Sequence, residues 1–286
     1  MRPSLTLSML QMTSTNRHAG NIATLRDAAR RALDDGADML VLPEASGFLN
    51  KNRDDAVAHV VAADVDPFIA AAQEIAAQTG LWIHTGSTPV TGQGDRFRNH
   101  GSLIDPTGAI TATYDKIHLF DVFLEGRPAT GESGRYGAGD TAVLADTPWG
   151  PLGLSVCYDL RFPHLYRDYA KGGATLMLIP SAFTIPTGRA HWEVLLRARA
   201  IENGAYVVAA AQVGEHDDGR RTYGHSMIVS PWGEVLADLG PDAPGQVTLT
   251  LDMGAVASAR RQIPSLANER PYRMVHQPGD QTRAAE

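Results

Sequence analysis

Three residues in this 286-residue chain have side chains and positions suited to covalent catalysis: Cys157, Glu44 and Lys116. Cys157 is the only cysteine, and it ends the strand-like run 154–157 just before a polar turn. A lone cysteine has no disulfide partner in its own chain, and α/β proteins present reactive groups at the carboxyl ends of strands. Cys157 is therefore a candidate nucleophile. The alternative is a buried thiol that packs as a small hydrophobic side chain.

An acid and a base occupy comparable positions. Glu44 ends the apolar run 39–44, and Lys116 follows a second strand-like stretch in the sequence YDKIHL at 114–119. Each of them alone is also compatible with a solvated charge at a strand end, because charged side chains are mostly exposed. Together with Cys157 they would provide a nucleophile, a proton acceptor and a cation.

The three local sequences, LPEAS, YDKIHLFD and SVCYDLRFP, resemble in this order the Glu-Lys-Cys triad of the nitrilase superfamily of carbon-nitrogen hydrolases. The resemblance runs from Met1 to about Tyr272. It includes the stretches PSAF at 180–183, AHWEVLLRARAIE at 190–202, YVVAAAQ at 206–212, YGHS at 223–226 and PWG at 231–233. Within the superfamily, LLRARAIE and VVAAAQ look closer to the deaminated glutathione amidases than to the ω-amidases.

This resemblance implies a cysteine amidase. Cys157 would attack an amide carbonyl and form a thioester, and Glu44 would move protons between the thiol, the leaving amine and water. Lys116 and the backbone N–H of Tyr158 would stabilise the negative oxygen of the tetrahedral intermediate. A positive Lys116 is also expected to lower the pKa of the thiol.

The resemblance also assigns a second active-site glutamate. Glu132 lies 16 residues after Lys116, at the matching position, and would orient Lys116 or the substrate. Glu125, in the same loop, is a competing candidate, and a solvated loop glutamate is the alternative for Glu132.

The implied reaction is cleavage of deaminated glutathione, an anionic amide, to 2-oxoglutarate and cysteinylglycine. The candidate substrate-binding residues are Tyr158, Arg161, Phe183, Thr187 and His191. The arginines nearest in sequence to the suspected chemistry are Arg161, Arg189, Arg197 and Arg199, with surface or structural pairing as the alternative.

Three rival functions stay open. An ω-amidase would act on α-ketoglutaramate or α-ketosuccinamate instead. A papain-like pairing of Cys157 with His164 or His191 has no supporting local motif. A catalytically inactive binding or scaffold protein is the alternative outside enzymes, although such a protein has no physical reason to keep a buried charge pair beside a thiol.

Composition and short motifs limit the ligands, partners and cellular compartment that are expected for this chain. The chain has 25 basic and 32 acidic residues, a formal charge of −7 that repels polyanions, so nucleic acid is not an expected partner. The first twelve residues are too short and too polar for a signal peptide or membrane span, and a single cysteine fits a reducing compartment, so a cytoplasmic protein is expected. No metal-ligand spacing or phosphate-binding glycine loop occurs in the sequence, so no metal or cofactor is expected.

Hydrophobic periodicity predicts an α/β protein. The expected helices lie at 21–35, 66–79, 163–172 and 190–203. The expected strands lie at 4–10, 38–42, 81–88, 175–180 and 206–213. Hairpins are expected over 99–114 and around 148–150 and 231–233, whereas 216–221 is expected to be a solvated turn. Hairpins mixed with crossover helices indicate two facing mixed sheets with outer helices, which matches the α-β-β-α sandwich of the nitrilase superfamily.

One domain is expected over residues 1–272, because composition shows no linker and no repeat. The polar tail 273–286 is expected to be partly disordered. In the resembled family the C-terminal extension often packs across a dimer interface, so the resemblance implies a homodimer.

Overall fold

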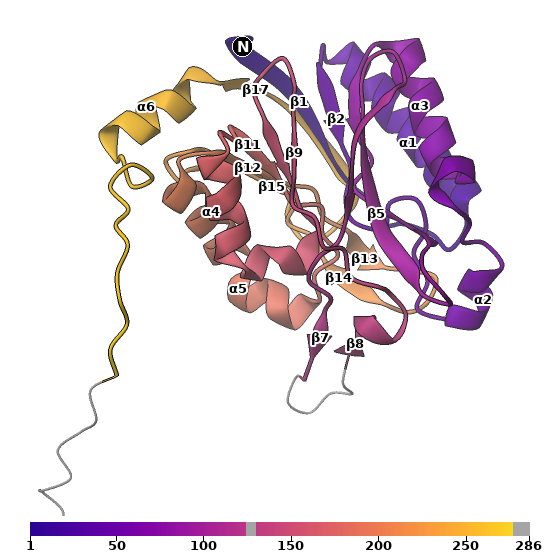
Figure 1. Cartoon of the computed structure of the whole chain (residues 1–286). Coiled ribbons are helices and arrows are strands. Elements are labelled where there is room, and N and C mark those ends of the chain that lie inside the picture. The colour runs from indigo at the N-terminus through magenta and orange to yellow at the C-terminus, as the bar shows by residue number, and fades with distance from the viewer. Residues whose placement is uncertain (124–129, 277–286) are drawn as a thin grey trace, which may run out of the picture.

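Two large β-sheets lie face to face, with helices on the outer face of each, in the computed structural model of the chain (Figure 1). The structure describes residues 1–123 and 130–276. The strands of the first sheet are β1 (Ser4–Gln11), β2 (Met39–Val41), β3 (Trp82–His84), β4 (Thr88–Thr91), β5 (Phe97–Ile104), β6 (Ile110–Asp115) and β17 (Gly245–Asp252). Their order is β17-β1-β2-β3-β5-β4, with β6 also paired to β5.

The second sheet has six strands and is also mixed. Its strands are β9 (Val143–Ala145), β10 (Leu152–Leu154), β11 (Leu176–Leu178), β12 (Tyr206–Ala209), β15 (Met227–Val229) and β16 (Val235–Asp238), in the order β16-β15-β12-β11-β10-β9. The central strands β10, β11 and β12 are parallel, and the flanking pairs are antiparallel. Two small hairpins lie outside these sheets: β7 (Asp121–Val122) with β8 (Thr130–Gly131), and β13 (Val213–Glu215) with β14 (Arg221–Tyr223).

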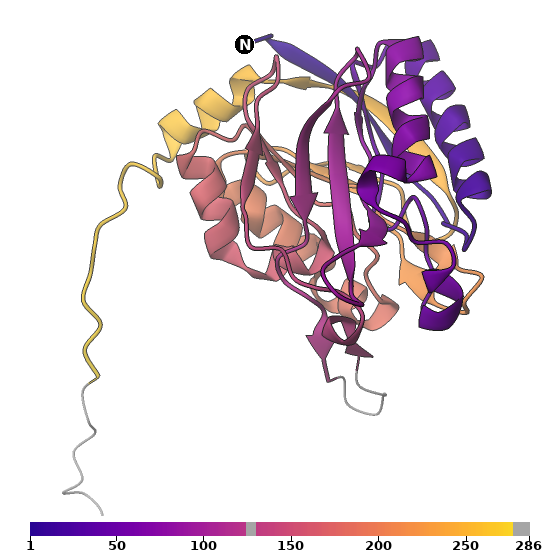
Figure 2. The same ribbon diagram turned by 45° about the vertical axis from the view of Figure 1, so that its right-hand side comes forward.

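Two helices cover each sheet. The helices α1 (His18–Asp34) and α3 (Pro67–Thr79) pack on the first sheet, and α4 (Pro163–Lys171) and α5 (Ile185–Asn203) pack on the second (Figures 1 and 2). The shorter helices are α2 (Arg53–Val57), α6 (Gly254–Gln262), η1 (Ala63–Val65), η2 (Glu132–Gly134) and η3 (Cys157–Arg161). The predicted α-β-β-α sandwich is confirmed. Over the described part of the chain, no helix combines the length and apolar character needed to cross a membrane.

Alternation along β2 places the first catalytic candidate. Met39 and Val41 pack in the core between the sheets, whereas Leu40 packs with α1 and α3. Because β2 is parallel to both β1 and β3, all three strands leave the sheet at the same edge. Glu44 lies three residues after the end of β2 and therefore lies at the edge of the space between the two sheets.

The predicted strand 81–88 is wrong, because the chain forms two strands there. Gly86, between β3 and β4, has φ 66°, and a Cβ atom at this position would lie 1.9 Å from the carbonyl oxygen of Pro43. Only glycine allows this approach, and the approach interrupts the ladder. Glycine here also lets the segment that carries Glu44 pack tightly beside the break.

Helix and strand ends differ from the predictions where long-range contacts decide them. The helix predicted at 190–203 begins at Ile185, because Pro186 lies in its first turn, where proline is favoured. The strand predicted at 206–213 ends at Ala209, and the chain continues into β13. Strand β17 and helix α6 were not predicted.

The predicted solvated turn at 216–221 is wrong for His216, which is buried. Its Nδ1 lies 2.9 Å from the carbonyl oxygen of Ser14 and its Nε2 lies 2.9 Å from Oγ1 of Thr222. Burial lowers the pKa of His216. The partner Ser14 is about 200 residues away in the sequence, so a local pattern could not predict this contact.

Candidate active site

Cys157 lies at a sharp turn between a strand and a helix. The strand β10 ends at Leu154, three residues earlier than the apolar run predicted, and η3 begins at Cys157. Cys157 has φ 52°, a left-handed backbone conformation that residues other than glycine rarely adopt. Its N–H donates to the carbonyl oxygen of Pro180 at 2.9 Å, which fixes the turn against the neighbouring segment. Such strain is found at functional sites, where the surrounding structure maintains it.

Glu44 is buried and its carboxylate accepts hydrogen bonds on both oxygens. Oε1 accepts from Nζ of Lys116 at 3.0 Å and from Nδ2 of Asn99 at 2.9 Å. Oε2 accepts from the backbone N–H of Ala182 at 2.8 Å. The Cys157 thiol lies close enough for this carboxylate, together with burial, to raise the pKa of the thiol. The acid and the thiol therefore lie beside each other between the two sheets.

Lys116 is buried between two carboxylates. Its Nζ lies 3.1 and 2.9 Å from the two oxygens of Glu132, in addition to the contact with Glu44. Oε2 of Glu132 also accepts from the backbone N–H of Phe120 at 2.6 Å. The structure thus brings Glu132 into the cluster with Lys116, while the competing candidate Glu125 lies outside the described residues.

The protonation states follow from these contacts. Burial raises the pKa of Glu44, but Lys116 and hydrogen bonds from Cys157, Lys116 and Asn99 outweigh it, so the net pKa is lowered. Burial lowers the pKa of Lys116, but Glu132 and Glu44 raise it well above its usual value. Burial and the Glu44 carboxylate raise the pKa of Cys157, and Lys116 only partly offsets them. Lys116 lowers the pKa of the thiol, as expected, but burial and Glu44 outweigh it and the net pKa is raised.

The resting site consequently contains a neutral thiol, an ionised Glu44 and a positive Lys116. This distribution suits a mechanism in which the thiol loses its proton only as it attacks, because the acceptor is already nearby and ionised. The backbone N–H of Tyr158, the first amide after Cys157, has no hydrogen-bond partner among the described residues. It is available for an oxyanion.

Asp159 joins the segments that carry the lysine and the cysteine. Its buried carboxylate accepts from the hydroxyl of Tyr114 at 2.8 Å, from the backbone N–H of His118 at 2.9 Å and from the backbone N–H of Val156 at 2.8 Å. Its Oδ1 also lies 2.6 Å from Nδ1 of His118. Asp159 therefore holds the chain after Lys116 against the turn at Cys157.

Four of the five substrate-binding candidates lie together beside this cluster. The guanidinium of Arg161 lies over the rings of Tyr158 and Phe183, at 5.8 and 5.6 Å from their centroids. It is also 3.3 Å from Nδ1 of His191. The fifth candidate, Thr187, is buried and its hydroxyl donates to the carbonyl oxygen of Thr184. That bond explains Thr187 as part of the first turn of α5.

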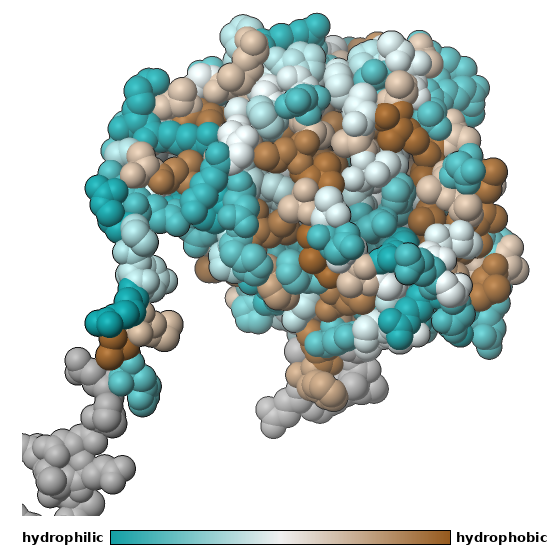
Figure 3. Space-filling model, in the orientation of Figure 1, coloured by the Kyte–Doolittle hydropathy of each residue, from teal (hydrophilic) through white to brown (hydrophobic). Residues whose placement is uncertain are grey.

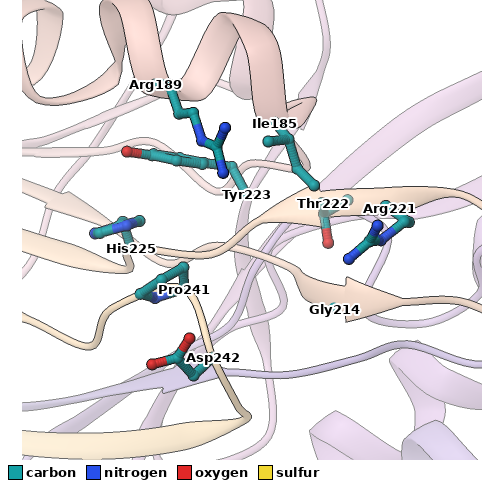
Figure 4. Close-up of a pocket in the computed structure, with 9 residues that line it drawn as sticks. All are labelled: Ile185, Arg189, Gly214, Arg221, Thr222, Tyr223, His225, Pro241 and Asp242. Carbon is teal, nitrogen blue, oxygen red and sulfur yellow. The ribbon is translucent and has the colours of Figure 1, made fainter.

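The other arginines near the motifs lie elsewhere. Arg199 is buried and donates to the carbonyl oxygen of Leu160, so it is structural, and Arg197 donates to the carbonyl oxygen of Gly233. Arg189 lines a separate pocket of about 310 Å³ between α5, β13 and β14 (Figure 4). The residues that line this pocket are Ile185, Arg189, Gly214, Arg221, Thr222, Tyr223, His225, Pro241 and Asp242. None of them belongs to the cluster around Cys157.

Asn99 is the site residue that the sequence did not indicate. It is a buried polar residue on β5, and its amide contacts Glu44 and, at 3.5 Å, Oε1 of Glu132. Its carbonyl oxygen also accepts from the backbone N–H of Lys116 at 3.0 Å. The signal in the sequence is weak, since only the register of the predicted hairpin over 99–114 would bring Asn99 beside Lys116.

The carbon-nitrogen hydrolase family model matches residues 6–261 of this chain. The chain belongs to this family. It is 38% identical over 269 residues to a deaminated glutathione amidase from Yersinia enterocolitica, an alignment that covers 92% of each protein. Among solved structures, the NitFhit protein of C. elegans superimposes with a TM-score of 0.86 at 38% identity, over 94% of this chain and 65% of that one.

A further similar solved structure is that of an amidase. A mutant of the amidase from Nesterenkonia sp. AN1, with acrylamide added at its active-site cysteine, superimposes with a TM-score of 0.76 at 28% identity, over 91% of this chain and 98% of that one. The predicted membership of the nitrilase superfamily is confirmed, and this carbon-nitrogen hydrolase is an enzyme that acts on amides. Within the described ranges 1–123 and 130–276, no group of three His, Cys, Asp or Glu side chains could hold a metal ion.

Proposed function

We propose that the protein hydrolyses a linear amide through a thioester on Cys157, with deaminated glutathione as the substrate. The observation that carries the mechanism is the placement of the buried Cys157 thiol beside the buried carboxylate of Glu44, which is paired with Lys116 at 3.0 Å. A buried thiol acting only as a hydrophobic side chain would not require a carboxylate and an ammonium beside it, since burying charges is costly.

In the first half of the reaction, Sγ of Cys157 attacks the amide carbonyl carbon while Glu44 takes the thiol proton. The carbonyl oxygen becomes an oxyanion, which Lys116 and the N–H of Tyr158 stabilise. Glu44 then donates the proton to the amide nitrogen, the C–N bond breaks and the amine leaves. The acyl group stays on Cys157 as a thioester.

In the second half, water attacks the thioester carbon and Glu44 accepts a proton from it. The C–S bond breaks, the thiolate recovers the proton from Glu44 and the carboxylic acid leaves. For deaminated glutathione, the bond broken joins the γ-acyl carbon to the cysteinyl nitrogen, and the products are cysteinylglycine and 2-oxoglutarate. Glu132 holds Lys116 in place throughout, because both of its oxygens contact Nζ.

The choice of substrate rests on similarity and on one local cation. The relative from Yersinia enterocolitica, 38% identical over most of both chains, is a deaminated glutathione amidase. In this chain the guanidinium of Arg161 lies between Tyr158 and Phe183, close to the cluster, and could pair with a carboxylate of the substrate. A local cation is required because the formal charge of −7 repels an anion at long range.

We expect kcat/KM for deaminated glutathione to exceed that for α-ketoglutaramate at least about 10-fold, because contacts to the dipeptide part add transition-state binding that the smaller amide lacks. Competition between the two amides in one tube, followed by liquid chromatography, measures this ratio directly. A preference for α-ketoglutaramate would establish the ω-amidase alternative, and strong activity on simple nitriles would contradict both. No activity on any amide, together with an unreactive thiol, would support a binding protein.

We also propose a cytoplasmic homodimer. The C-terminal arm, residues 270–276, stands away from the body and carries apolar side chains (Figures 2 and 3). Tyr272 and Met274 are 90% and 87% exposed, and Val194 and Ile201 are exposed on α5. A second copy of the chain would cover such residues. Light scattering should therefore give twice the chain mass of 30.6 kDa, and a single-chain mass would refute the dimer.

A further inference from the structure

The hydrogen bonds to the Glu44 carboxylate leave one acceptor position free, and the contacts show on which of the two oxygens it lies. An ionised carboxylate has about four lone-pair positions, two on each oxygen. On Oε1, both are taken, by Lys116 at 3.0 Å and by Asn99 at 2.9 Å. On Oε2, the backbone N–H of Ala182 takes one. The remaining position is on Oε2.

We propose that Asn99 is a positioning residue that fills Oε1 of Glu44 and thereby makes Oε2 the atom that accepts the Cys157 proton. This inference rests on the proposed thioester mechanism. The side-chain amide of Asn99 donates to Glu44 and Glu132 and not to the thiol, so it acts through Glu44. Without its amide, Oε1 would hold only Lys116, and the carboxylate could turn or take the proton on either oxygen.

The side-chain amide of Asn99 also lies between the carboxylates of Glu44 and Glu132 and donates to both. The cluster holds two glutamates and one lysine, so one negative charge is not balanced by the lysine. The two hydrogens of the Asn99 amide point to Oε1 of Glu44 and to Oε1 of Glu132, the latter at a longer 3.5 Å. A neutral donor between them keeps Glu44 ionised without adding a second cation, which would compete with Lys116 for the oxyanion.

The register of strands β5 and β6 in the first sheet places Asn99 within hydrogen-bond distance of Glu44. Asn99 and Lys116 are adjacent across the β5–β6 hairpin, because the carbonyl oxygen of Asn99 accepts from the N–H of Lys116. The other groups near Glu44 are the Cys157 thiol, Lys116, Glu132 and the phenol of Tyr136, whose pKa is raised by burial and, to a smaller extent, by the two glutamates. Of the neutral side chains among these, Asn99 is the one whose amide donates a hydrogen bond to Glu44 in the described part of the chain.

The sign of the pH effect follows from this bond. Glu44 works as a base when ionised, above its pKa, and the hydrogen bond from Asn99 helps to lower that pKa. Removing the donor should raise it, so the acidic limb of the kcat/KM profile should move to higher pH. In Asn99→Asp the new carboxylate repels Glu44, so the limb should move further.

The test compares Asn99→Ala and Asn99→Asp with Ser102→Ala. We expect both Asn99 variants to lose at least about 10-fold in kcat, with KM for deaminated glutathione within about threefold of wild type. Ser102 is buried on the same strand, and its hydroxyl has no partner among the described residues, so it controls for damage to β5. Its removal should leave rate and pH profile unchanged. Asn99→Asp keeps the volume of the side chain if the alanine variant does not fold.

A second readout separates this inference from the proposed function. The rate at which iodoacetamide alkylates Cys157 is measured against pH, which needs no amide substrate. A shifted alkylation profile in the Asn99 variants would support the role of Asn99 even if no tested amide is hydrolysed. Wild-type profiles of both hydrolysis and alkylation in folded Asn99 variants, or an equal shift in Ser102→Ala, would overturn it.

Discussion

Replacing Cys157 by alanine should lower amide hydrolysis by at least about 10⁴-fold, because no other group in the chain can form the thioester. Wild-type enzyme quenched during turnover should carry an acyl adduct on the peptide that contains Cys157. Since Cys157 is the only cysteine, any mass added through a thioester belongs to this residue. Mass spectrometry of the quenched protein and a rate assay measure the two effects.

The fold should survive this substitution. The thiol is small, and alanine adopts the left-handed conformation at φ 52° no less readily than cysteine does. Thermal unfolding of the alanine variant is the control, with a midpoint close to that of the wild type. A folded alanine variant with normal turnover would refute the thioester mechanism and return Cys157 to the role of a buried hydrophobic side chain.

The catalytic candidates could be predicted because each follows a strand in a recognisable local motif. Lys116 comes directly after β6, and Glu44 and Cys157 come shortly after β2 and β10. Strands that face each other across a sandwich bring such residues together once the fold class is known. The contacts among Glu44, Lys116 and Cys157 therefore follow from their positions after strands and from the sandwich fold. The sequence pattern indicates both the positions and the fold.

What the sequence could not predict depends on contacts between distant segments. Asn99 contacts Glu44 across 55 residues, and a polar residue in a strand gives no sign of its partner. The motifs indicated the lysine that lowers the pKa of Cys157, but not the burial and the Glu44 carboxylate that raise the net pKa of the thiol. Likewise, the break at Gly86 follows from the approach of Pro43, a neighbour in space alone.

Replacing Glu44 by glutamine should cost at least about 10²-fold in kcat while the protein stays folded, because the residue transfers a proton in both halves of the reaction. An amide oxygen of glutamine can still accept from Lys116 and Asn99 at Oε1. The amide nitrogen would then face the N–H of Ala182, donor against donor, and could not accept the thiol proton.

The Glu44→Gln variant also tests whether Glu44 causes the loss of activity at low pH, the acidic limb of the pH–rate profile. In the wild type, hydrolysis should fall as pH drops through the lowered pKa of Glu44, since a protonated carboxyl cannot take the thiol proton. The residual activity of Glu44→Gln should lack this limb, because glutamine does not ionise. Circular dichroism controls for folding, and Glu74→Gln, at an exposed glutamate on α3, is the matched control and should keep wild-type kcat. If Glu44→Gln kept a normal rate or the same acidic limb, the general base would have to be another group, and Glu132, the second carboxylate on Lys116, would be the next residue to replace.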